Sequence, residues 1–297
     1  MFALQRSISL QTANWQPYHD VFHHHHASVA GIIRVAQHIR SPQLHNQRHI
    51  LVYLPPSYHT SQKRYPVLYM HDGQNLFDNA TSYAGEWGVD ETMEKMSREE
   101  GLEAIVVGIP NMGAVRMDEY SPFKDVRHGG GLGNQYLAFL VNTLKPIIDQ
   151  DFRTLPGKRY TGIMGSSMGA LISFYAFFRY PDFFGFTGMM SPSLWIAKGA
   201  IFRYTEAARF NPGKIYLDVG TRELGDSETD MWMQRTLSRR YYASVRYLKR
   251  VLVGKGYRPV HDLLHIEEKW ADHSESAWAR RLPDAVRFFL KTTGHDD

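Results

Sequence analysis

The stretch YTGIMGSSMGA, residues 160–170, decides the fold of this chain. Its first half is short and apolar, as in a buried strand, and it runs into an apolar segment, residues 171–178, that is typical of a buried helix. Between the two lies the pattern G-x-S-x-G, which holds a serine hydroxyl exposed on a sharp turn between strand and helix. We therefore expect Ser167 to be a nucleophile, with the N–H of Met168 beside it. The alternative is an ordinary Gly/Ser turn.

Short apolar runs alternate with amphipathic segments along most of the chain. Because such alternation indicates a mainly parallel sheet with helices on both faces, we expect one α/β domain over residues 31–297. Residues 31–40 and 48–54 alternate like an antiparallel strand pair at its start. The other expected strands are 66–70, the strand before Ser167, 104–109, 186–190, 214–219 and 263–267, and the expected helices are 89–100, 134–149, the one after Ser167, 230–254 and 275–290.

The first thirty residues form an N-terminal extension that is weakly structured by pattern. It contains the run His23 to His26, which we interpret as a solvated loop, because adjacent histidines cannot easily all face one metal ion. The segment lacks the continuous apolar core of a signal peptide, and no run approaches the ~18 apolar residues of a membrane span. The sequence therefore predicts no membrane association and a cytoplasmic location.

Composition excludes several classes of site. The chain of 297 residues has no cysteine, which rules out disulfides, thiolate catalysis and Cys-based metal centres. A net charge of +4 with dispersed Lys and Arg predicts no nucleic-acid partner. A cluster of basic residues within 239–250 lies on a predicted helix, and we interpret it as a solvated face. No group of ligands at zinc spacing is evident, so we expect no metal or cofactor.

A serine nucleophile needs a histidine base oriented by an acid. In a sheet of this type the partners follow in the order Ser, Asp/Glu, His, each just past a strand. His273 lies after the last expected strand, whereas His261 precedes this strand and His265 lies within it. Glu223 follows the strand 214–219 closely. Its rivals are Asp226, slightly further on, and Asp218, which is disfavoured because it lies inside the strand.

Four further positions are candidates for contacts with the reacting substrate. The loop that begins at Asp72 follows a buried strand, and the Gln74 N–H is our choice for the second oxyanion donor, with Gly73 N–H as the alternative. We expect Asp72, at the sheet edge, and Trp195 to help bind substrate. Arg116 lies in a long irregular section and either clamps an anionic substrate or braces the loop through Asp118 or Glu119.

Together these motifs resemble the putative-esterase (esterase D-like) family of α/β-hydrolases over about residues 41–290. The resemblance implies an α/β-hydrolase fold with Ser167 as nucleophile, His273 as base and Glu223 as acid, although several relatives carry Asp at this last position. Its marks are VYLP at 52–55, YPVLYMHDGQNLFD at 65–78, EYSP at 119–122, the serine motif, YP at 180–181, SPSLW at 191–195 and GTRE at 220–223.

Hydrolysis of a small-molecule ester through an acyl-enzyme is the function that these residues favour. The same three residues also suit acyl transfer to a sugar hydroxyl, and a non-catalytic binding module on this fold is a third reading. The sequence leaves the acyl group, the alcohol and the oligomeric state open.

Overall fold

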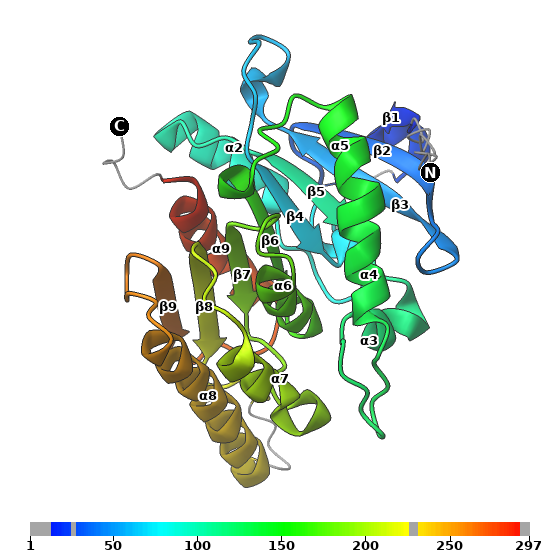
Figure 1. Ribbon diagram of the computed structural model, residues 1–297. Coiled ribbons are helices and arrows are strands. Elements are labelled where there is room, and N and C mark those ends of the chain that lie inside the picture. The colour runs from blue at the N-terminus through cyan, green and yellow to red at the C-terminus, as the bar shows by residue number, and fades with distance from the viewer. Residues whose placement is uncertain (1–12, 25–27, 226–230, 292–297) are drawn as a thin grey trace, which may run out of the picture.

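The computed structural model describes residues 13–24, 28–225 and 231–291, and in these residues nine strands form one sheet (Figure 1). Their spatial order is β1-β2-β3-β5-β4-β6-β7-β8-β9. From β5 to β9 every neighbouring pair is parallel, whereas β1, β2 and β3 run antiparallel to one another and β3 runs antiparallel to β5. The strands are β1 (Trp15–Pro17), β2 (Ile32–Ser41), β3 (Asn46–Leu54), β4 (Val67–His71), β5 (Ile105–Ile109), β6 (Thr161–Ser166), β7 (Phe186–Met190), β8 (Lys214–Gly220) and β9 (Leu263–Glu268).

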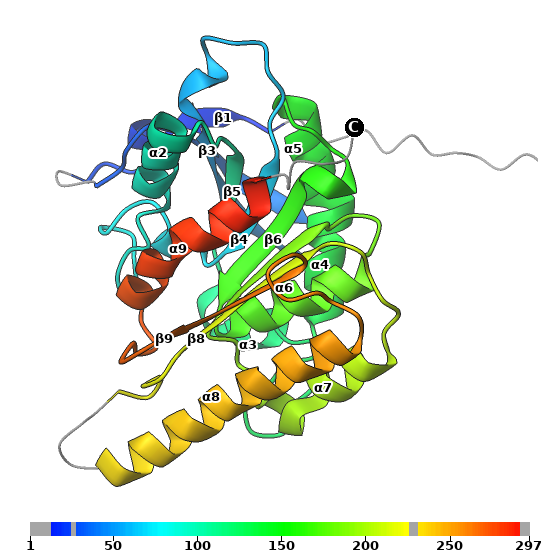
Figure 2. The ribbon, with the colours of Figure 1, turned by 90° about the vertical axis from the view of Figure 1, so that its left-hand side faces the viewer.

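Helices cover both faces of this sheet, as Figure 2 shows. Two of them, α2 (Val89–Glu100) and α9 (Glu275–Leu290), pack on one face. The opposite face carries α4 (Gly133–Phe139), α5 (Lys145–Asp151), α6 (Met168–Arg179), α7 (Ile196–Ala207) and α8 (Met231–Gly254), and a π-helical segment, Leu140–Leu144, joins α4 to α5. Single turns of helix occur at α1 (Tyr18–Val21), α3 (Arg116–Glu119) and the 3₁₀ segment η2 (Gly73–Asn75).

The two faces of the sheet explain why the central strands are apolar throughout. Successive side chains of a strand point to opposite faces, so Ile163 of β6 enters the core under α6 while Met164 enters the core under α9. Val107 and Val106 divide in the same way in β5. The expected α/β architecture, with its antiparallel N-terminal pair, is confirmed.

Parallel strands bring their carboxyl ends to one edge of the sheet. The loops after β4, β6, β7, β8 and β9 therefore emerge together, and they carry Asp72, Ser167, Ser191, Glu223 and His273. None of the helices within the described ranges has a stretch long and apolar enough to span a bilayer.

Part of the N-terminal extension is structured, which differs from the expectation for residues 1–30. β1 pairs with β2, and the Trp15 indole donates to Asp151 at 2.8 Å and packs against Phe152. Tyr18 is buried and donates to Asp78 at 2.7 Å. The order of this segment comes from contacts with distant parts of the chain, so local periodicity does not reveal it. His25 and His26 lie outside the described residues.

Helix α7 is the second difference, because no helix was predicted over Ile196–Ala207. Its first turn is irregular: Ala197, Lys198 and Gly199 all have positive φ angles. This interruption breaks the helical periodicity just where the segment starts. The turn is held from outside by Asp125, whose carboxylate accepts the N–H of Ala197 at 2.8 Å.

Candidate active site

Ser167 stands on a strained turn between β6 and α6. Its φ of 56° and ψ of −117° lie in a region that residues with a side chain rarely adopt, at a typical cost of about 1–3 kcal/mol. The turn is held by two backbone hydrogen bonds, from Ser167 N–H to Met190 carbonyl at 2.9 Å and from Ser193 N–H to Ser167 carbonyl at 3.0 Å. Neighbouring β7 thus fixes the serine backbone, and the local geometry agrees with that of a nucleophile elbow.

The two glycines of the motif allow strand and helix to approach closely. A Cβ atom on Gly165 would lie 2.9 Å from the backbone carbon of Gly169, and one on Gly169 would lie 3.2 Å from His71 Cβ. Any larger residue at the first position would push the start of α6 away from β6. The motif therefore serves the packing around Ser167 as well as its exposure.

Glu223 and His273 meet across the ends of β8 and β9. Nδ1 of His273 lies 2.6 Å from Oε2 of Glu223, and the Glu223 side chain is fully buried whereas that of His273 is 27% exposed. The second carboxylate oxygen accepts the Gly220 N–H at 2.5 Å and the Ser191 hydroxyl at 2.7 Å. Gly220 permits this arrangement because a Cβ there would lie 2.3 Å from the Ala271 carbonyl oxygen.

Ser191 links Glu223 to charges and dipoles behind it. While its hydroxyl donates to Glu223, it accepts the Trp278 indole N–H and an Arg281 N–H, each at 3.1 Å. Arg281 also pairs with the buried Asp218 at 3.0 Å. Burial raises the pKa of Asp218 to about 6, although Arg281 opposes this rise. The sequence analysis quoted Ser191 within the SPSLW motif but assigned it no role, and it did not mention Arg281, because only the fold brings α9 against the ends of β7 and β8.

The rival acids have different positions. Asp218 lies inside β8, where it accepts the Tyr216 hydroxyl at 3.0 Å and the Ser191 N–H at 3.0 Å. Asp226 lies outside the described residues. His265 lies in β9 and His261 precedes it, as expected, and neither lines the cavity that contains Ser167 in the described part of the chain.

A cavity of about 750 Å³ opens at this edge of the sheet and is lined by both Ser167 and His273. The Ser167 hydroxyl is hydrogen-bonded to the Ser193 hydroxyl at 3.0 Å. His273 packs edge-on against Trp278, with ring centroids 5.0 Å apart. The remaining lining residues form an aromatic and polar wall and comprise Asp72, Gln74, Asn75, Tyr83, Ala84, Trp87, Pro110, Asn111, Gly113, Arg116, Ser166, Glu275 and Trp278.

Asp72 and Arg116 form a two-pronged ion pair in the wall of this cavity. The guanidinium Nε and Nη2 lie 2.7 and 2.8 Å from the two carboxylate oxygens, and the Asn111 amide donates to the same carboxylate at 2.7 Å. Burial by itself would raise the pKa of Asp72, but the hydrogen bonds and charge of Arg116 outweigh it and lower this pKa. The expected brace through Asp118 or Glu119 is replaced by this pair.

Those two acids have other partners. Glu119 is buried against Arg48 at 2.7 Å, and Asp118 accepts the Gly130 N–H at 2.7 Å. The long section between β5 and α4 is thereby folded onto itself, and Arg116 is free to point towards β4. The sequence cannot decide which acid pairs with Arg116, because Asp118 and Glu119 are its near neighbours in the chain and Asp72 lies at a strand end. Only the tertiary structure shows that the partner is Asp72.

Gln74 lines the cavity from η2, and its side-chain oxygen accepts the Asn111 N–H at 3.2 Å. Met168 is the first residue of α6, a position whose backbone N–H has no partner within the helix. Both positions suit the expected backbone donors. Trp195, in contrast, is 47% exposed, packs against His128 at 4.8 Å between ring centroids and is absent from the cavity lining among the described residues. Its place at the start of α7 directs it outward, which gives the predicted substrate contact no support.

His71 is a site residue that sequence reasoning passed over. It is buried at the end of β4, where its Nδ1 lies 2.8 Å from the Tyr136 hydroxyl. Burial lowers the pKa of His71 to about 3, so the ring is neutral at ordinary pH. It supports the serine turn by packing against Gly165 and Gly169. The sequence feature that could have indicated this role is the position of His71 at the end of a strand, directly before Asp72.

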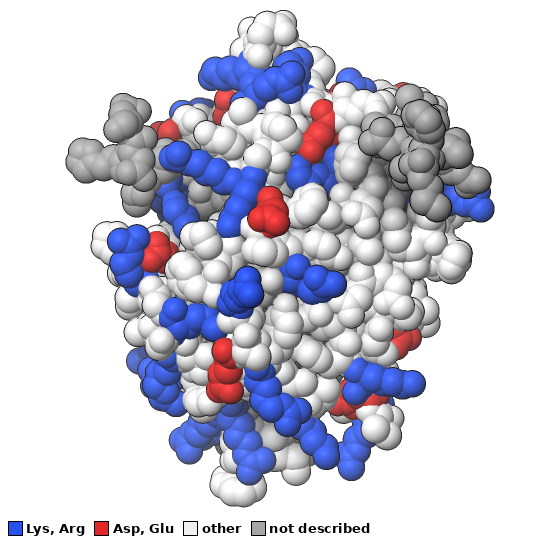
Figure 3. Space-filling model, viewed as in Figure 1, with Lys and Arg blue, Asp and Glu red and all other residues white. Residues whose placement is uncertain are grey.

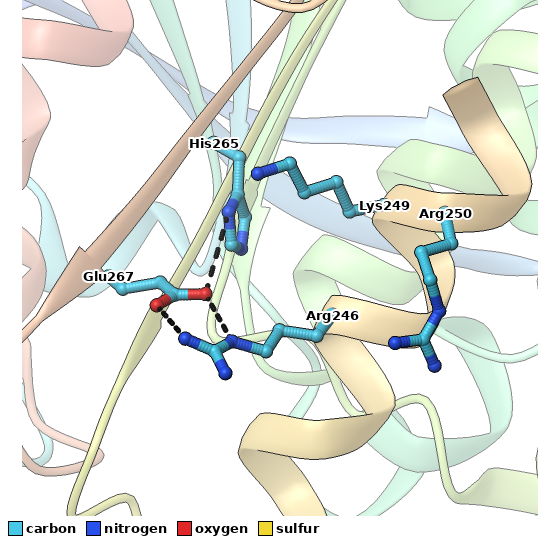
Figure 4. A pocket seen from close by; sticks show the side chains of 5 residues that line it. All are labelled: Arg246, Lys249, Arg250, His265 and Glu267. Atoms are coloured by element: carbon cyan, nitrogen blue, oxygen red, sulfur yellow. Dashed lines mark hydrogen bonds and ion pairs between the residues drawn. The ribbon is translucent and has the colours of Figure 1, made fainter.

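A second cavity, of about 490 Å³, lies between α8 and β9 (Figure 4). Arg246 pairs with Glu267 there at 2.7 Å, and Lys249 points towards His265. Burial is the main cause that lowers the pKa of His265 to about 4. The cavity belongs to a basic surface along α8, visible at the lower left of Figure 3, and its lining contains no serine or other hydroxyl nucleophile among the described residues. We therefore take the Ser167 cavity as the reactive one.

Comparisons with known proteins identify a family for this chain. The family model described as "Putative esterase" matches residues 41–289. The Bacillus subtilis protein YbbA is 26% identical over 248 residues, which are 81% of this chain and 92% of that protein.

Solved structures share the fold. The siderophore hydrolase EstB from Aspergillus nidulans has a TM-score of 0.67 at 19% identity, covering 89% of this chain and 97% of that chain. The IroE-like serine hydrolase from Shewanella oneidensis has a TM-score of 0.65 at 18% identity, covering 89% of this chain and 82% of that chain.

Proposed function

The chain belongs to the putative esterase family and is thus a serine carboxylic ester hydrolase, and from this premise we propose that Ser167, His273 and Glu223 are its catalytic triad. The expected family is confirmed by a match over residues 41–289. The substrate class that the family indicates is a small-molecule ester. The roles of the individual residues are our proposal.

In the proposed reaction the Ser167 oxygen attacks the ester carbonyl carbon while its proton passes to Nε2 of His273. Glu223 accepts the Nδ1–H of His273, which fixes the tautomer and stabilises the imidazolium without taking the proton. The imidazolium then protonates the leaving alcohol, and an acyl-enzyme remains. Water, deprotonated by His273, attacks this intermediate and releases the acid and the Ser167 hydroxyl.

Backbone donors hold the oxyanion that forms in both steps. We assign this role to the N–H groups of Met168 and Gln74, because Met168 begins α6 directly after the nucleophile and Gln74 lines the same cavity. A positioned donor of this kind typically contributes about 10²–10³ in kcat. The positive end of the α6 dipole adds to the stabilisation of negative charge at this point.

The single observation that carries the proposal is the 2.6 Å contact of His273 Nδ1 with the buried Glu223 carboxylate, in a cavity that also contains Ser167. The buried carboxylate accepts a histidine N–H and two further hydrogen bonds, and these contacts hold it in position to orient the imidazole. The Ser167 hydroxyl contacts the Ser193 hydroxyl in the free protein, and in the proposed reaction it engages His273 instead. Such contacts commonly tighten only when substrate is bound.

The deciding experiment compares Ser167→Ala with Ser166→Ala on p-nitrophenyl esters of graded chain length. We expect the first change to lower kcat by about 10⁶, as in other triads. Ser166 occupies the variable position of the motif, so its change should cost far less and serves as the matched control. Circular dichroism would verify that both variants fold. A Ser167→Ala protein that retains a tenth of the wild-type activity would exclude the proposed mechanism.

Aromatic side chains at the cavity suit a flat or hydrophobic acyl group. Trp87 and Trp278 pack together with ring centroids 5.6 Å apart, and both line the cavity. A screen that sets feruloyl and catecholate esters beside simple alkyl esters would test this preference. We expect kcat/KM to rise with acyl groups that cover these rings, and a preference for acetyl over every aromatic acyl group would contradict it.

A further inference from the structure

Three carboxylates gather at the start of α2, outside the set of reacting groups. Glu86, Asp90 and Glu91 each offer an oxygen, and these oxygens all lie within 4.8 Å of one another. Asp90 is completely buried, Glu86 is half-buried and Glu91 is exposed. Burial is the main cause that raises the pKa of Asp90 to about 9, and a hydrogen bond with Glu91 adds to this rise.

The hydrogen bonds that reach this cluster within the described residues come from neutral donors. Asp90 Oδ2 accepts the Ala30 N–H at 2.6 Å, and Glu86 Oε2 accepts the Ser28 hydroxyl at 2.7 Å. The other oxygens of these two side chains, Asp90 Oδ1 and Glu86 Oε1, are enclosed and have no hydrogen-bond partner in the described part of the chain. A buried polar atom without a partner is costly, so a cation bound at these oxygens would stabilise the folded protein.

The backbone makes room for the third carboxylate. Gly88 precedes α2 with a φ of +58°, and a Cβ at this position would lie 3.3 Å from Glu91 Oε2. The Glu91 side chain is therefore folded back over the first turn of α2, towards Glu86, although it could extend freely into solvent. Segments 28–30 and 86–91 close the cluster from two sides.

We propose that Glu86, Asp90 and Glu91 bind one calcium ion. Carboxylate oxygens are the ligands that hard divalent cations prefer, and Ca²⁺ accepts six to eight of them in irregular geometry at about 2.3–2.6 Å. Oxygens on opposite sides of Ca²⁺ therefore lie about 5 Å apart, so three oxygens within 4.8 Å of one another can share one ion. Mg²⁺ demands a near-ideal octahedron with opposite ligands about 4.2 Å apart and keeps most of its water. Zn²⁺ would favour nitrogen or sulfur ligands. Water completes the coordination shell.

The ion would brace one wall of the Ser167 cavity without touching the reacting atoms. Trp87 lies between the ligands in the sequence, its N–H donates to the Asn75 carbonyl at 2.9 Å, and its side chain lines the cavity. Neutralising the carboxylates on either side of Trp87 holds this segment against α9. The proposal concerns stability and is independent of the catalytic roles given to Ser167, His273 and Glu223.

Thermal unfolding of the EDTA-treated protein tests the proposal directly. We expect Ca²⁺ at about a hundred times its dissociation constant to raise the Tm by roughly 5 °C, and Mg²⁺ at the same concentration to raise it less. Isothermal titration with CaCl₂ should give one site. No change in Tm up to about 10 mM Ca²⁺, the upper range for weak protein sites, would overturn the proposal, as would an equal response to Mg²⁺.

Asp90→Asn is the matching variant, with Glu99→Gln, an exposed change on the same helix, as control. In EDTA Asp90→Asn should be about as stable as wild type, because the amide has nearly the same shape as the carboxyl group that it replaces, but it should lose most of the Tm rise with Ca²⁺. Glu99→Gln should keep the full rise. If Asp90→Asn fails to fold, Glu91→Gln at the exposed ligand replaces it. A Ca²⁺ response unchanged in Asp90→Asn or Glu91→Gln would overturn the assignment of ligands.

Discussion

Glu223 shows how much a single side chain depends on its surroundings. Its carboxylate contacts His273 Nδ1, the Gly220 N–H and the Ser191 hydroxyl, and Ser191 is in turn bonded to Arg281. An ionised group buried in this way is stabilised by charge-assisted hydrogen bonds, which are stronger than neutral ones. The length of Glu compared with Asp lets it reach His273 from the third position after β8.

Replacing Glu223 by Gln should lower kcat by about 10⁴ at neutral pH, because the amide cannot hold His273 in the required tautomer or stabilise its charge. Steady-state rates on p-nitrophenyl acetate would measure this. Ser191→Ala should cost less, roughly 10–100-fold, since it removes one charge-assisted hydrogen bond from the acid. Asp226→Asn is the comparison, and a larger loss there than in Glu223→Gln would transfer the role of the acid to Asp226.

The pair of Asp72 with Arg116 should matter first for stability. Arg116→Ala leaves the buried Asp72 carboxylate without its counter-charge, so the free energy of unfolding should fall by about 3 kcal/mol, less if water enters around the partly exposed guanidinium. Urea unfolding measures this change. The double variant Asp72→Asn with Arg116→Gln should recover part of the loss.

The same variant tests whether Arg116 binds substrate. Because Nε and Nη2 of Arg116 already bond Asp72, we expect Arg116→Ala to raise KM similarly for acidic and neutral esters. A KM that rises for acidic esters alone would show that Arg116 binds an anionic group of the substrate in addition to Asp72.

At the scale of elements, the contact between β6 and α6 sets the position of the nucleophile. α6 starts immediately after Ser167, and Gly165, Gly169 and His71 fill the space between strand, helix and β4 without a gap. A close-packed junction of this kind cannot absorb an added methyl group except by shifting an element, at a typical cost of about 1–3 kcal/mol.

Gly165→Ala should therefore destabilise the protein by about 1–3 kcal/mol and lower kcat, because the methyl group would meet the Gly169 backbone at 2.9 Å and His71 at 3.0 Å. Chemical denaturation and kinetics on one ester would follow both effects. Gly157→Ala, just before β6, is the control, since its nearest neighbour is Tyr160 at 3.9 Å. Equal losses of stability and of kcat in the two variants would show that the junction between β6 and α6 is not closely packed.

At the scale of the whole molecule, two buried histidines should lower stability as the pH falls below the ordinary histidine range, whereas buried carboxyl groups with a raised pKa, such as Asp218 at about 6, act in the opposite direction. Burial lowers the pKa of His71 to about 3 and that of His265 to about 4. Both groups therefore stay neutral in the folded state while the unfolded chain takes up protons near pH 6.5. At these two sites the unfolded state then binds more protons, so their contribution to the free energy of unfolding decreases as pH falls.

Between pH 6.5 and 5 each of these histidines should contribute a loss of up to about 1.4 kcal/mol per pH unit. Urea unfolding at several pH values would measure the slope. His265→Gln should remove the contribution of one histidine from this slope, because the variant lacks one group that titrates only in the unfolded state. The neighbouring Glu267 would contribute only at more acid pH, because Arg246 is the main cause that lowers its pKa to about 2. An unchanged slope in His265→Gln would contradict the account.

Sequence reasoning recovered the elements whose evidence is local. Strands β7 and β8 and helices α2 and α9 begin and end within a residue of the expected bounds, because alternating apolar runs and cap residues mark them directly. β1 and α7 were missed, since β1 is ordered by pairing with β2 and the first turn of α7 departs from helical geometry. Trp195 was expected near substrate, but the sequence does not show that the start of α7 directs this side chain outward.

The sequence by itself determined the fold class, the family and the residue on the serine turn, because hydrophobic period and the spacing of Gly and Ser are properties of neighbouring residues. Only the tertiary structure decided which groups meet: Glu223 with His273, Asp72 with Arg116, and Ser191 with both Glu223 and Arg281. These partners lie 32 to 90 positions apart and come together because parallel strands deliver their loops to one edge of the sheet. At Asp72 the charge and hydrogen bonds of Arg116 outweigh the effect of burial on its pKa, and this balance is a property of the folded molecule alone.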